Sequence, residues 1–357
     1  MAKYTLYKGN YQYLCIILGF NLFKMHKIKQ STQNELARVQ SLIKKELTSE
    51  KIIQEIYEYI FNLEGKKARA LISLLASQSR NSTGSGAQMA TILGNTRRIE
   101  LASIIELLHT ATLVHDDVVD ESNLRRGEKS VNQVWNNSYS VLMGDFIYSK
   151  AFILMVKLNQ ALILEELAKA TNDIAKGEII QLGLFKNKDS ITLQNLLKVS
   201  YLKTGRLFEA SAKTGAMLAN RSNDEIKCFG LLGKALGIAF QIQDDILDYE
   251  AMQLNTGKPA LKDFREGKIT FPLFYAMQNA SNTDREFLLS YLGKEKLSKT
   301  TQRKIYDLVK MDKASQQTNV LLEKYLQGSK KQLTKLSDHS CYDEMLNLIS
   351  FLKIRKK

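Results

Sequence analysis

The sequence LASIIELLHTATLVHDDVVD occupies residues 101–120. Its apolar residues recur at the spacing of one helical face, as Leu101 and Ile105 do, and it ends in an acidic pentad. On an α-helix the first and fifth residues of that pentad, Asp116 and Asp120, lie one turn apart on the same face. The stretch therefore predicts a helix that carries a pair of carboxylates.

A second acidic pentad repeats the pattern later in the chain. The two copies are DDVVD at residues 116–120 and DDILD at residues 244–248, and each follows an apolar run. An acidic face that is merely solvated does not have this context. Grouped carboxylates beside an apolar wall are costly to desolvate unless a hard cation such as Mg²⁺ neutralises them, usually with phosphate oxygens completing its shell. Two such pentads facing each other predict a diphosphate site.

The composition favours long helices. Of the 357 residues, 44% are hydrophobic and 25% are charged, which suits a large core. The two prolines are Pro259 and Pro272, so no proline breaks a helix before residue 259. Sustained period-two alternation and Asn-Gly hairpin signals are both missing. We therefore predict an all-α bundle of about ten or more helices, with the site between facing helices.

Charge and cysteine content narrow the class of protein. The formal net charge is +14, but the lysines are scattered rather than gathered in one basic stripe, and no nucleic-acid motif accompanies them. We therefore expect no nucleic-acid partner. The three cysteines, Cys15, Cys228 and Cys341, have neither metal-binding spacing nor an even number, which favours a reducing cytoplasm.

The first thirty residues differ from the rest of the chain. Residues 9–23 carry no charge, but this stretch is shorter than the roughly 20 residues that cross a bilayer. It is either an interfacial anchor, with peripheral membrane association, or a dispensable segment that precedes a true start at Met25, and we favour the second. We divide the chain into an N-terminal extension, residues 1–30, and a single domain, residues 31–357.

Basic residues accompany both pentads and form a third cluster near the N-terminus. The clusters are Arg125-Arg126-Gly127, Gly257-Lys258-Pro259 with residues 263–270, and Gly65-Lys66-Lys67-Ala68-Arg69. Arginine suits bidentate phosphate contacts, lysine supplies a compact charge, and glycine lets the backbone approach an anion. Each cluster alone is more typical of a surface. Their placement beside the pentads favours a diphosphate site.

With these motifs the chain resembles the trans-isoprenyl diphosphate synthases, the polyprenyl synthetase family, and in detail the bacterial octaprenyl diphosphate synthases. The resemblance covers about residues 35–350. Its most specific stretches are residues 106–122, 125–127, 144–146, 177–182, 203–210 and 240–245. It implies an isoprenoid-synthase-type helical bundle with a central active-site cavity, and a homodimer.

The same resemblance implies the reaction, a head-to-tail condensation of isopentenyl diphosphate onto an allylic diphosphate such as farnesyl diphosphate. Metal and lysine would stabilise the departing diphosphate, so that the allylic C–O bond ionises and the isopentenyl double bond attacks the cation. No protein nucleophile is required. Loss of a proton then leaves the chain one isoprene unit longer.

Roles for individual residues follow from the resemblance. About three Mg²⁺ ions would bridge the allylic diphosphate and the pentads. The metal ligands would be Asp116, Asp120 and Asp244, and the catalytic group would also include Asp117, Asp245, Lys203 and Lys258, with Asp248 as a further candidate. The allylic diphosphate would contact Arg125, Lys203, Lys258 and Lys268, with Thr204 and Gln241 nearby, and isopentenyl diphosphate would contact Lys66, Arg69, His109 and Arg126.

Product length depends on the residues that precede the first pentad on its helix. Ala111 and Thr112, five and four residues before the pentad, are both small. Family members with short products usually have a bulky aromatic residue there, so we expect a tunnel open to a long all-trans tail, an octaprenyl chain for ubiquinone or another quinone. Tyr148, Phe152 and Met155 have the spacing of one helical face and could form the floor, or they could be core residues.

Three alternative functions share some of these motifs. A short-chain farnesyl or geranylgeranyl diphosphate synthase is disfavoured by Ala111 and Thr112. A terpene cyclase is disfavoured because its second metal motif normally mixes Asn, Ser or Thr with Glu. A non-catalytic subunit of a heteromeric synthase is allowed by residues 64–70, where EGKKARA replaces the family's usual GGKRxRP. Such subunits typically lose pentad aspartates, however, and this chain keeps them all.

Overall fold

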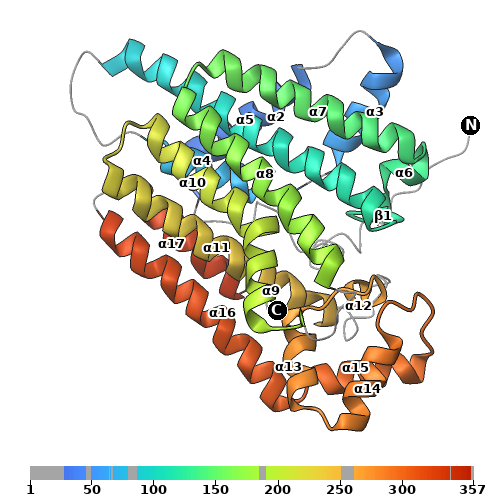
Figure 1. The fold of residues 1–357 in the computed structure, drawn as a ribbon. Coiled ribbons are helices and arrows are strands. Elements are labelled where there is room, and N and C mark those ends of the chain that lie inside the picture. Colours follow the sequence, from blue (N-terminus) through green and yellow to red (C-terminus); the bar gives the residue numbers. More distant parts are fainter. Residues whose placement is uncertain are drawn as a thin grey trace, which may run out of the picture.

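The structure, a computed structural model, describes residues 28–45, 50–63, 65, 67–78, 87–184, 190–250, 261–337 and 339–354. Its α-helices are α2 (Gln30–Lys45), α3 (Lys51–Asn62), α4 (Ala68–Ala76), α5 (Ala87–Val119), α6 (Val131–Val134), α7 (Asn137–Leu158), α8 (Ala161–Leu184), α9 (Leu193–Ser200), α10 (Arg206–Leu218), α11 (Asn223–Glu250), α12 (Lys262–Arg265), α13 (Phe271–Asn279), α14 (Asn282–Tyr291), α15 (Lys299–Val309), α16 (Asp312–Leu333) and α17 (Tyr342–Ile354). A π-helical turn, η3 (Tyr201–Gly205), joins α9 to α10, and a 3-10 turn, η4 (Thr334–Leu336), follows α16. The predicted all-α class is confirmed (Figure 1).

A small β-hairpin is the exception to this helical pattern. Strand β1 (Leu124–Arg125) pairs antiparallel with β2 (Glu128–Lys129). Between them Arg126 and Gly127 have positive φ angles of 55° and 89°, as the two central residues of a type I′ turn do. The hairpin was not predicted, because arginine seldom takes a positive φ and the Asn-Gly signal is missing.

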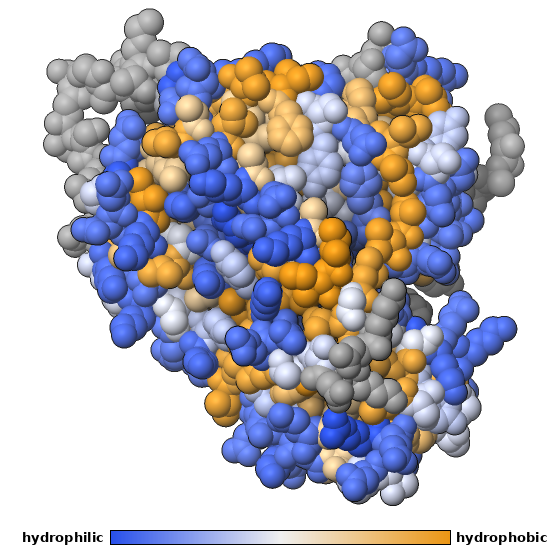
Figure 2. Space-filling view, viewed as in Figure 1, coloured by the Kyte–Doolittle hydropathy of each residue, from blue (hydrophilic) through white to orange (hydrophobic). Residues whose placement is uncertain are grey.

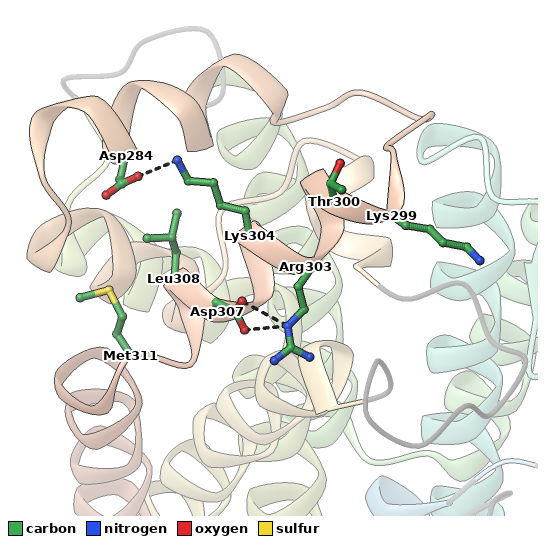
Figure 3. Close-up of a pocket in the computed structure, with 8 residues that line it drawn as sticks. All are labelled: Asp284, Lys299, Thr300, Arg303, Lys304, Asp307, Leu308 and Met311. Atoms are coloured by element: carbon green, nitrogen blue, oxygen red, sulfur yellow. Dashed lines mark hydrogen bonds and ion pairs between the residues drawn. The ribbon is translucent and has the colours of Figure 1, made fainter.

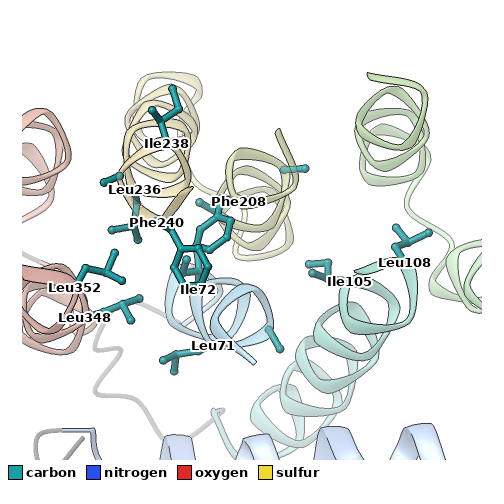
Figure 4. Packing of buried hydrophobic residues seen from close by; sticks show 14 of the residues in the cluster. Leu71, Ile72, Ile105, Leu108, Phe208, Leu236, Ile238, Phe240, Leu348 and Leu352 are labelled. Carbon is teal, nitrogen blue, oxygen red and sulfur yellow. The ribbon is translucent and has the colours of Figure 1, made fainter. Parts of the chain in front are cut away.

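The short helix α4 lies at the centre of the bundle. Its residues Ala70 to Ala76 are all buried, the pattern of a helix that is surrounded on every side. In Figure 4, Leu71 and Ile72 of α4 lie beside Phe208 of α10 and Phe240 of α11. Apolar side chains of α5 and α17 complete this cluster. The core therefore joins helices from both halves of the sequence.

The longest helices pack around this centre in pairs. Helix α5 runs along α7, α10 lies against α4 and α11, and α11 packs on α16. Helix α8 contacts both α10 and η3. Helices α14 and α15 form the end of the molecule that is far from α7 in Figure 1. The helices that carry the pentads, α5 and α11, are thereby linked through α4 and α10.

A buried carboxylate joins the first and last described helices. Glu344 on α17 is 1% exposed and accepts hydrogen bonds from the backbone N–H of Lys29 at 3.0 Å and from the hydroxyl of Thr32 at 2.9 Å. The amide of Gln78, just after α4, reaches its other oxygen at 3.5 Å. A buried carboxylate needs such partners, so this contact fixes α2 against α17.

The predicted extension, residues 1–30, overlaps the described residues only at positions 28–30. Ile28 is 6% exposed and belongs to the hydrophobic core. The uncharged stretch at residues 9–23 lies outside the described residues, and among those described no helix has the length and apolarity needed to span a membrane. The domain boundary at residue 30 stays a prediction.

A chain that starts at Met25 is expected to keep the turnover rate of the full chain, because the family resemblance begins only at about residue 35. Turnover and vesicle binding of the two chains should be measured side by side. If the shorter chain loses activity, or detaches from vesicles that retain the full chain, the anchor hypothesis is the better one.

Candidate active site

Both pentads lie at the C-terminal ends of long helices. Helix α5 ends at Val119, and the backbone N–H of Asp120 still donates to the carbonyl of Asp116 at 2.8 Å. Asp244 and Asp248 lie in the last turns of α11. The carbonyl groups at a helix C-terminus carry partial negative charge, which adds to the attraction of the carboxylates for a cation. The predicted helical setting of both pentads is confirmed.

Burial destabilises the ionised form of Asp116 in the first pentad and of Asp248 in the second. It raises the pKa of Asp116 to about 7, with a further contribution from the nearby carboxylate of Glu178. It also raises the pKa of Asp248 to about 7, and Asp263 contributes there. Crowded carboxylates that are poorly hydrated are stabilised by a cation. The residues present therefore fit a divalent metal.

A divalent metal bound here would need oxygen atoms from a ligand to complete its coordination. Among the described residues no three His, Cys, Asp or Glu side chains are already arranged as a metal site. Mg²⁺ prefers octahedral oxygen coordination and is commonly held by one or two carboxylates together with substrate phosphates and waters. The pentad carboxylates suit that mode of binding better than they suit a closed protein cage.

The second aspartate of each pentad has partners away from the other carboxylates. Asp117, 3% exposed, accepts hydrogen bonds of 3.0 Å at both oxygens from Nε of Arg125. Asp245, 4% exposed, accepts one from the Gln241 amide at 2.8 Å and one from the backbone N–H of Phe271 at 3.1 Å. Burial raises the pKa of both aspartates. These contacts anchor Arg125 and the start of α13.

A lysine that follows α12 connects the surroundings of the two pentads. Nζ of Lys268 lies 2.6 Å from the carboxylate of Asp120 and 2.8 Å from that of Glu266. Burial alone would lower its pKa, but Asp120, Glu266 and Asp263 together raise it. The backbone N–H of Asp263 in turn donates to Asp248 at 3.2 Å. The predicted juxtaposition of Lys268 with the pentads is thus present in the structure.

Consecutive residues of η3 have different partners. Nζ of Lys203 lies 2.6 Å from Oε2 of Glu178 on α8 and also donates to Oε1 of Gln181. The hydroxyl of Thr204 donates to Oε1 of Gln241 at 2.7 Å, and this side chain also contacts the second pentad. A π-helical turn is rare and frequently marks a functional site. Here it places one residue on the α8 side and the next on the α11 side.

Two glycines let neighbouring helices approach this turn. A Cβ at Gly177 of α8 would lie 2.8 Å from Cβ of Leu202, and a Cβ at Gly237 of α11 would lie 2.6 Å from Cα of Gly205. Side chains do not tolerate such distances, so close packing of α8 and α11 on η3 depends on glycine.

The basic cluster near the N-terminus meets α5 at a second group of cations. Nη1 of Arg69 and Nε2 of His109 are 2.9 Å apart. Burial lowers the pKa of Arg69 to about 10, and burial together with nearby arginines lowers the pKa of His109, which is therefore neutral and accepts from Arg69. Arg126 donates to the carbonyl of Leu63 at 2.8 Å and covers Gly65, where a Cβ would lie 2.6 Å from its guanidinium.

Two predicted ligands cannot be placed, and three residues near the site were not predicted. Lys66 and Lys258 lie outside the described residues. Glu106, which is 6% exposed beside Arg69 and Arg126, was given no role from the sequence, and neither were Glu178 and Gln181. All three belong to stretches that carry the family resemblance. The i, i+3 spacing of Glu178 and Gln181 was the available signal that they share one face of a helix.

The small residues expected to control product length lie inside the bundle. Ala111 is 0% exposed and belongs to the core. Thr112 is half-buried, and its hydroxyl donates to the carbonyl of His109 at 2.7 Å. Their position before the first pentad on α5 is as predicted, while their role in length control stays a prediction.

The three candidate floor residues do not share one environment. Tyr148 packs between His115 and Phe152, with ring centroids 5.7 and 6.4 Å away. Burial raises its pKa to about 12, with Asp116 contributing. Phe152 is 41% exposed, whereas Met155 is 2% exposed. Tyr148 is therefore the candidate that we retain, since Phe152 is exposed and Met155 is in the core, and its role as a floor stays a prediction.

A separate hollow lies between α14 and α15 (Figure 3). It is lined by Asp284, Lys299, Thr300, Arg303, Lys304, Asp307, Leu308 and Met311. Lys304 is paired with Asp284 at 2.9 Å and Arg303 with Asp307 at 3.0 Å. Exposed charges that are already paired offer little to an incoming ligand, and we assign no function to this hollow.

Comparison with known proteins agrees with the geometry of the pentads and their cations. The family model of polyprenyl synthetase matches residues 50–309. The chain belongs to the polyprenyl synthetase family. It is accordingly a prenyltransferase. The matched region contains both pentads and all the predicted ligands of this polyprenyl synthetase.

Relatives with long-chain products are similar over most of the chain. Octaprenyl diphosphate synthase of Escherichia coli (strain K12) is 40% identical over 258 residues, which cover 72% of this chain and 76% of the relative. A decaprenyl diphosphate synthase from Rhodobacter capsulatus has a solved structure with a TM-score of 0.81 and 32% identity, covering 92% of this chain and 98% of that one. A polyprenyl synthase from Caulobacter crescentus CB15, complexed with calcium and isoprenyl diphosphate, gives a TM-score of 0.81 at 30% identity and covers 94% and 98%.

These similarities confirm the prediction of a trans-prenyl diphosphate synthase with the isoprenoid-synthase helical fold. The names of the relatives agree with a long-chain product, and the short-chain alternative is not favoured.

The pKa values of Asp116 and Asp248 predict that cation binding near neutral pH releases protons. Both lie above the ordinary value of 3.8. Between about pH 4 and 7 these two groups are protonated in the cation-free folded chain but ionised in the unfolded chain. Their contribution to the free energy of unfolding therefore falls as the pH rises through that window. A bound cation removes this penalty. We expect Mg²⁺ with inorganic pyrophosphate to bind more tightly at about pH 8 than at about pH 6.

Calorimetry in two buffers of different ionisation enthalpy measures the released protons. The variant Asp248→Asn should release fewer protons than the unaltered chain. Pyrophosphate itself gives up the same number of protons in both titrations, so the difference between them reports the protein alone. Equal proton release by the two proteins would contradict the prediction.

Proposed function

We propose that this chain condenses isopentenyl diphosphate onto an allylic diphosphate, such as farnesyl diphosphate, to make a long all-trans polyprenyl diphosphate. The observation that carries the proposal is the pair of carboxylate pentads whose surroundings are joined by Lys268. An octaprenyl product for a quinone side chain is supported by the 40% identity to the E. coli octaprenyl diphosphate synthase.

The allylic diphosphate would be held between the pentads. Asp116, Asp120 and Asp244 would hold about three Mg²⁺ ions, which neutralise the diphosphate and make it a better leaving group. Lys203 and Lys268 already lie beside these carboxylates and would add positive charge to the same phosphates. The relative from Caulobacter crescentus, solved with calcium and isoprenyl diphosphate, supports a joint site for cation and diphosphate.

Asp117 and Asp245 would act through other residues. Asp117 holds the guanidinium of Arg125 in a fixed orientation, so that its remaining N–H groups can meet a phosphate. Asp245 orients the Gln241 amide, which in turn accepts from Thr204. The direct catalytic role predicted for both aspartates is thereby replaced in our proposal by an anchoring role.

Isopentenyl diphosphate would bind at the second group of cations. Arg69 and Arg126 converge there, and Glu106 partly compensates their charge while no ligand is bound. Neutral His109 accepts from Arg69 and so fixes the direction of its other N–H groups. Lys66 would add a further charge by family resemblance.

Product chromatography tests the proposal directly. The purified chain alone, incubated with farnesyl diphosphate, excess isopentenyl diphosphate and Mg²⁺, is expected to yield a long polyprenyl diphosphate. Products of farnesyl or geranylgeranyl length would point to the short-chain alternative. Activity that needs a second, different polypeptide would point to a heteromeric synthase.

We also propose that the enzyme is a cytoplasmic homodimer that pairs through α7. This helix exposes Leu142 (66%), Ile153 (48%) and Val156 (66%), and apolar side chains gather over α7 in Figure 2. A second copy is the partner that the family resemblance implies. The described cysteines, Cys228 and Cys341, are free thiols, as is usual in a reducing compartment.

Replacing Val156 by Glu is expected to shift the enzyme from dimer to monomer, because a charge would have to be buried in the pairing surface. Light scattering after size-exclusion chromatography measures the mass. Val320→Glu on α16 is the matched control, since Val320 is 64% exposed on another helix. A dimer that survives Val156→Glu would place the pairing surface elsewhere.

A further inference from the structure

Lys203 is held by two side chains from one face of α8. Its Nζ lies 2.6 Å from Oε2 of Glu178 and donates to Oε1 of Gln181. A lysine side chain has four rotatable bonds and loses rotamer entropy when it is fixed. Two acceptors, one charged and one neutral, define the direction of the ammonium group more closely than one acceptor would. Lys203 is therefore oriented before any ligand arrives.

The held ammonium lies within electrostatic range of the first pentad. Glu178 and Lys203 act in opposite directions on the pKa of Asp116, so both groups lie near that carboxylate. The side chains of Lys203 and Glu178 are 19% and 21% exposed, which leaves the pair partly accessible to a ligand. Among the described residues no hydrogen bond or ion pair joins the side chains of Lys203 and Asp116. Nζ of Lys203 is thus engaged by α8 rather than by Asp116.

The backbone packing of α8 against η3 supports the contact between Glu178 and Lys203. Gly177, next to Glu178, allows α8 to approach Leu202, since a Cβ there would lie 2.8 Å from the Leu202 Cβ and 3.1 Å from the Lys203 backbone nitrogen. Directly after η3, Arg206 is 6% exposed and makes 2.8 Å ion pairs with Glu166 and Asp173, both on α8. Helix α8 thus fixes the turn on either side of Lys203.

From these contacts we propose that Glu178, assisted by Gln181, is a positioning residue that aims Lys203 at the allylic diphosphate and keeps it from pairing with Asp116. This inference rests on the proposed role of Lys203 in binding that diphosphate. In the reaction Glu178 itself touches neither substrate nor metal. Its effect should therefore pass entirely through Lys203.

A double-mutant cycle tests that dependence. Glu178→Ala alone is expected to lower kcat/KM for the allylic diphosphate about tenfold, as loss of a supporting contact commonly does, while KM for isopentenyl diphosphate is unchanged. Glu178→Gln keeps an oxygen that accepts from Lys203 and should stay within about threefold of the unaltered enzyme. In a Lys203→Ala background, Glu178→Ala should have no further effect, because the residues act as a unit.

Binding provides a readout that does not depend on turnover. Calorimetric titration with inorganic pyrophosphate and Mg²⁺ should show about tenfold weaker binding for Glu178→Ala and for Lys203→Ala, and no additional loss in the double variant. Glu165→Gln on the same helix is the control, since Glu165 is exposed and pairs with Lys169. Thermal unfolding of each variant should be recorded in parallel, so that pyrophosphate binding is compared between folded proteins.

The outcomes separate this inference from the proposed function. Normal kinetics and pyrophosphate binding in Lys203→Ala would overturn the role of Lys203 and the inference with it. An impaired Lys203→Ala with a normal Glu178→Ala would overturn the inference alone. An additive loss in the double variant would also overturn it, since Glu178 would then act independently, for example as a ligand in its own right.

Discussion

Replacing Asp116 or Asp244 by alanine is expected to lower turnover ~10³-fold or more, equivalent to about 4 kcal/mol in the activation free energy, while the fold is retained. Each change removes a carboxylate that would hold Mg²⁺ against the leaving diphosphate. Burial raises the pKa of Asp116 to about 7, so its ionised form is a cost to the cation-free fold. Alanine at 116 removes that cost, and the variant should fold at least as well as the unaltered chain.

Steady-state rates at saturating Mg²⁺ and circular dichroism measure the two parts of this expectation. Asp224→Ala is a suitable control, because Asp224 lies exposed in the first turn of α11, at the opposite end from the second pentad. Near-normal turnover of either pentad variant would contradict a mechanism that uses both pentads. Loss of helical signal would mean that the lost activity reports unfolding.

Replacing Ala111 by tyrosine is expected to shorten the product to farnesyl or geranylgeranyl length while the first condensations continue. Residue 111 is about 7.5 Å along α5 from Asp116, the distance of five helical residues. A phenol ring there would block the path of a tail that descends from the diphosphate. Arg69 lies on α4 and Arg126 in the β-hairpin rather than on α5, so KM for isopentenyl diphosphate should not change.

The buried position of Ala111 sets the control for this experiment. Its side chain is 0% exposed, and enlarging a core residue typically costs about 1–3 kcal/mol. Thermal unfolding should therefore accompany product chromatography. Ala111→Ser changes the volume little and should leave the product long. A folded Ala111→Tyr enzyme that still makes products of unchanged length would show that the tail takes another path.

Local sequence was sufficient to predict the helices that carry the pentads. Periodicity over residues 101–120 and the lack of proline depend only on neighbours in the chain, and they led to α5 correctly. The basic cluster of residues 263–270 was expected beside the pentads, but the 2.6 Å ion pair of Lys268 with Asp120 was not specified.

Features that depend on contacts between distant segments could not be predicted in this way. The pattern DDxxD does not reveal that Asp117 is engaged by Arg125, or that Asp245 receives the first N–H of α13. The π-helical turn at η3 depends on how closely α8 and α11 approach it. Gly177 and Gly237 permit this approach, but the presence of two glycines does not predict it. Phe152 shares its spacing with Met155, yet the neighbours of α7 leave one exposed and the other buried.

The buried carboxylate of Glu344 couples the local unfolding of the first and last described helices. It joins Lys29 to a helix 315 positions later in the chain, so fraying of α17 would strip the Lys29 amide and the Thr32 hydroxyl of their acceptor at the same moment. The two ends should therefore come apart as one cooperative unit, and amide hydrogens of α2 and α17 should exchange with solvent at matching free energies of opening. Glu344→Ala should lower both together and leave the exchange of α4 nearly unchanged.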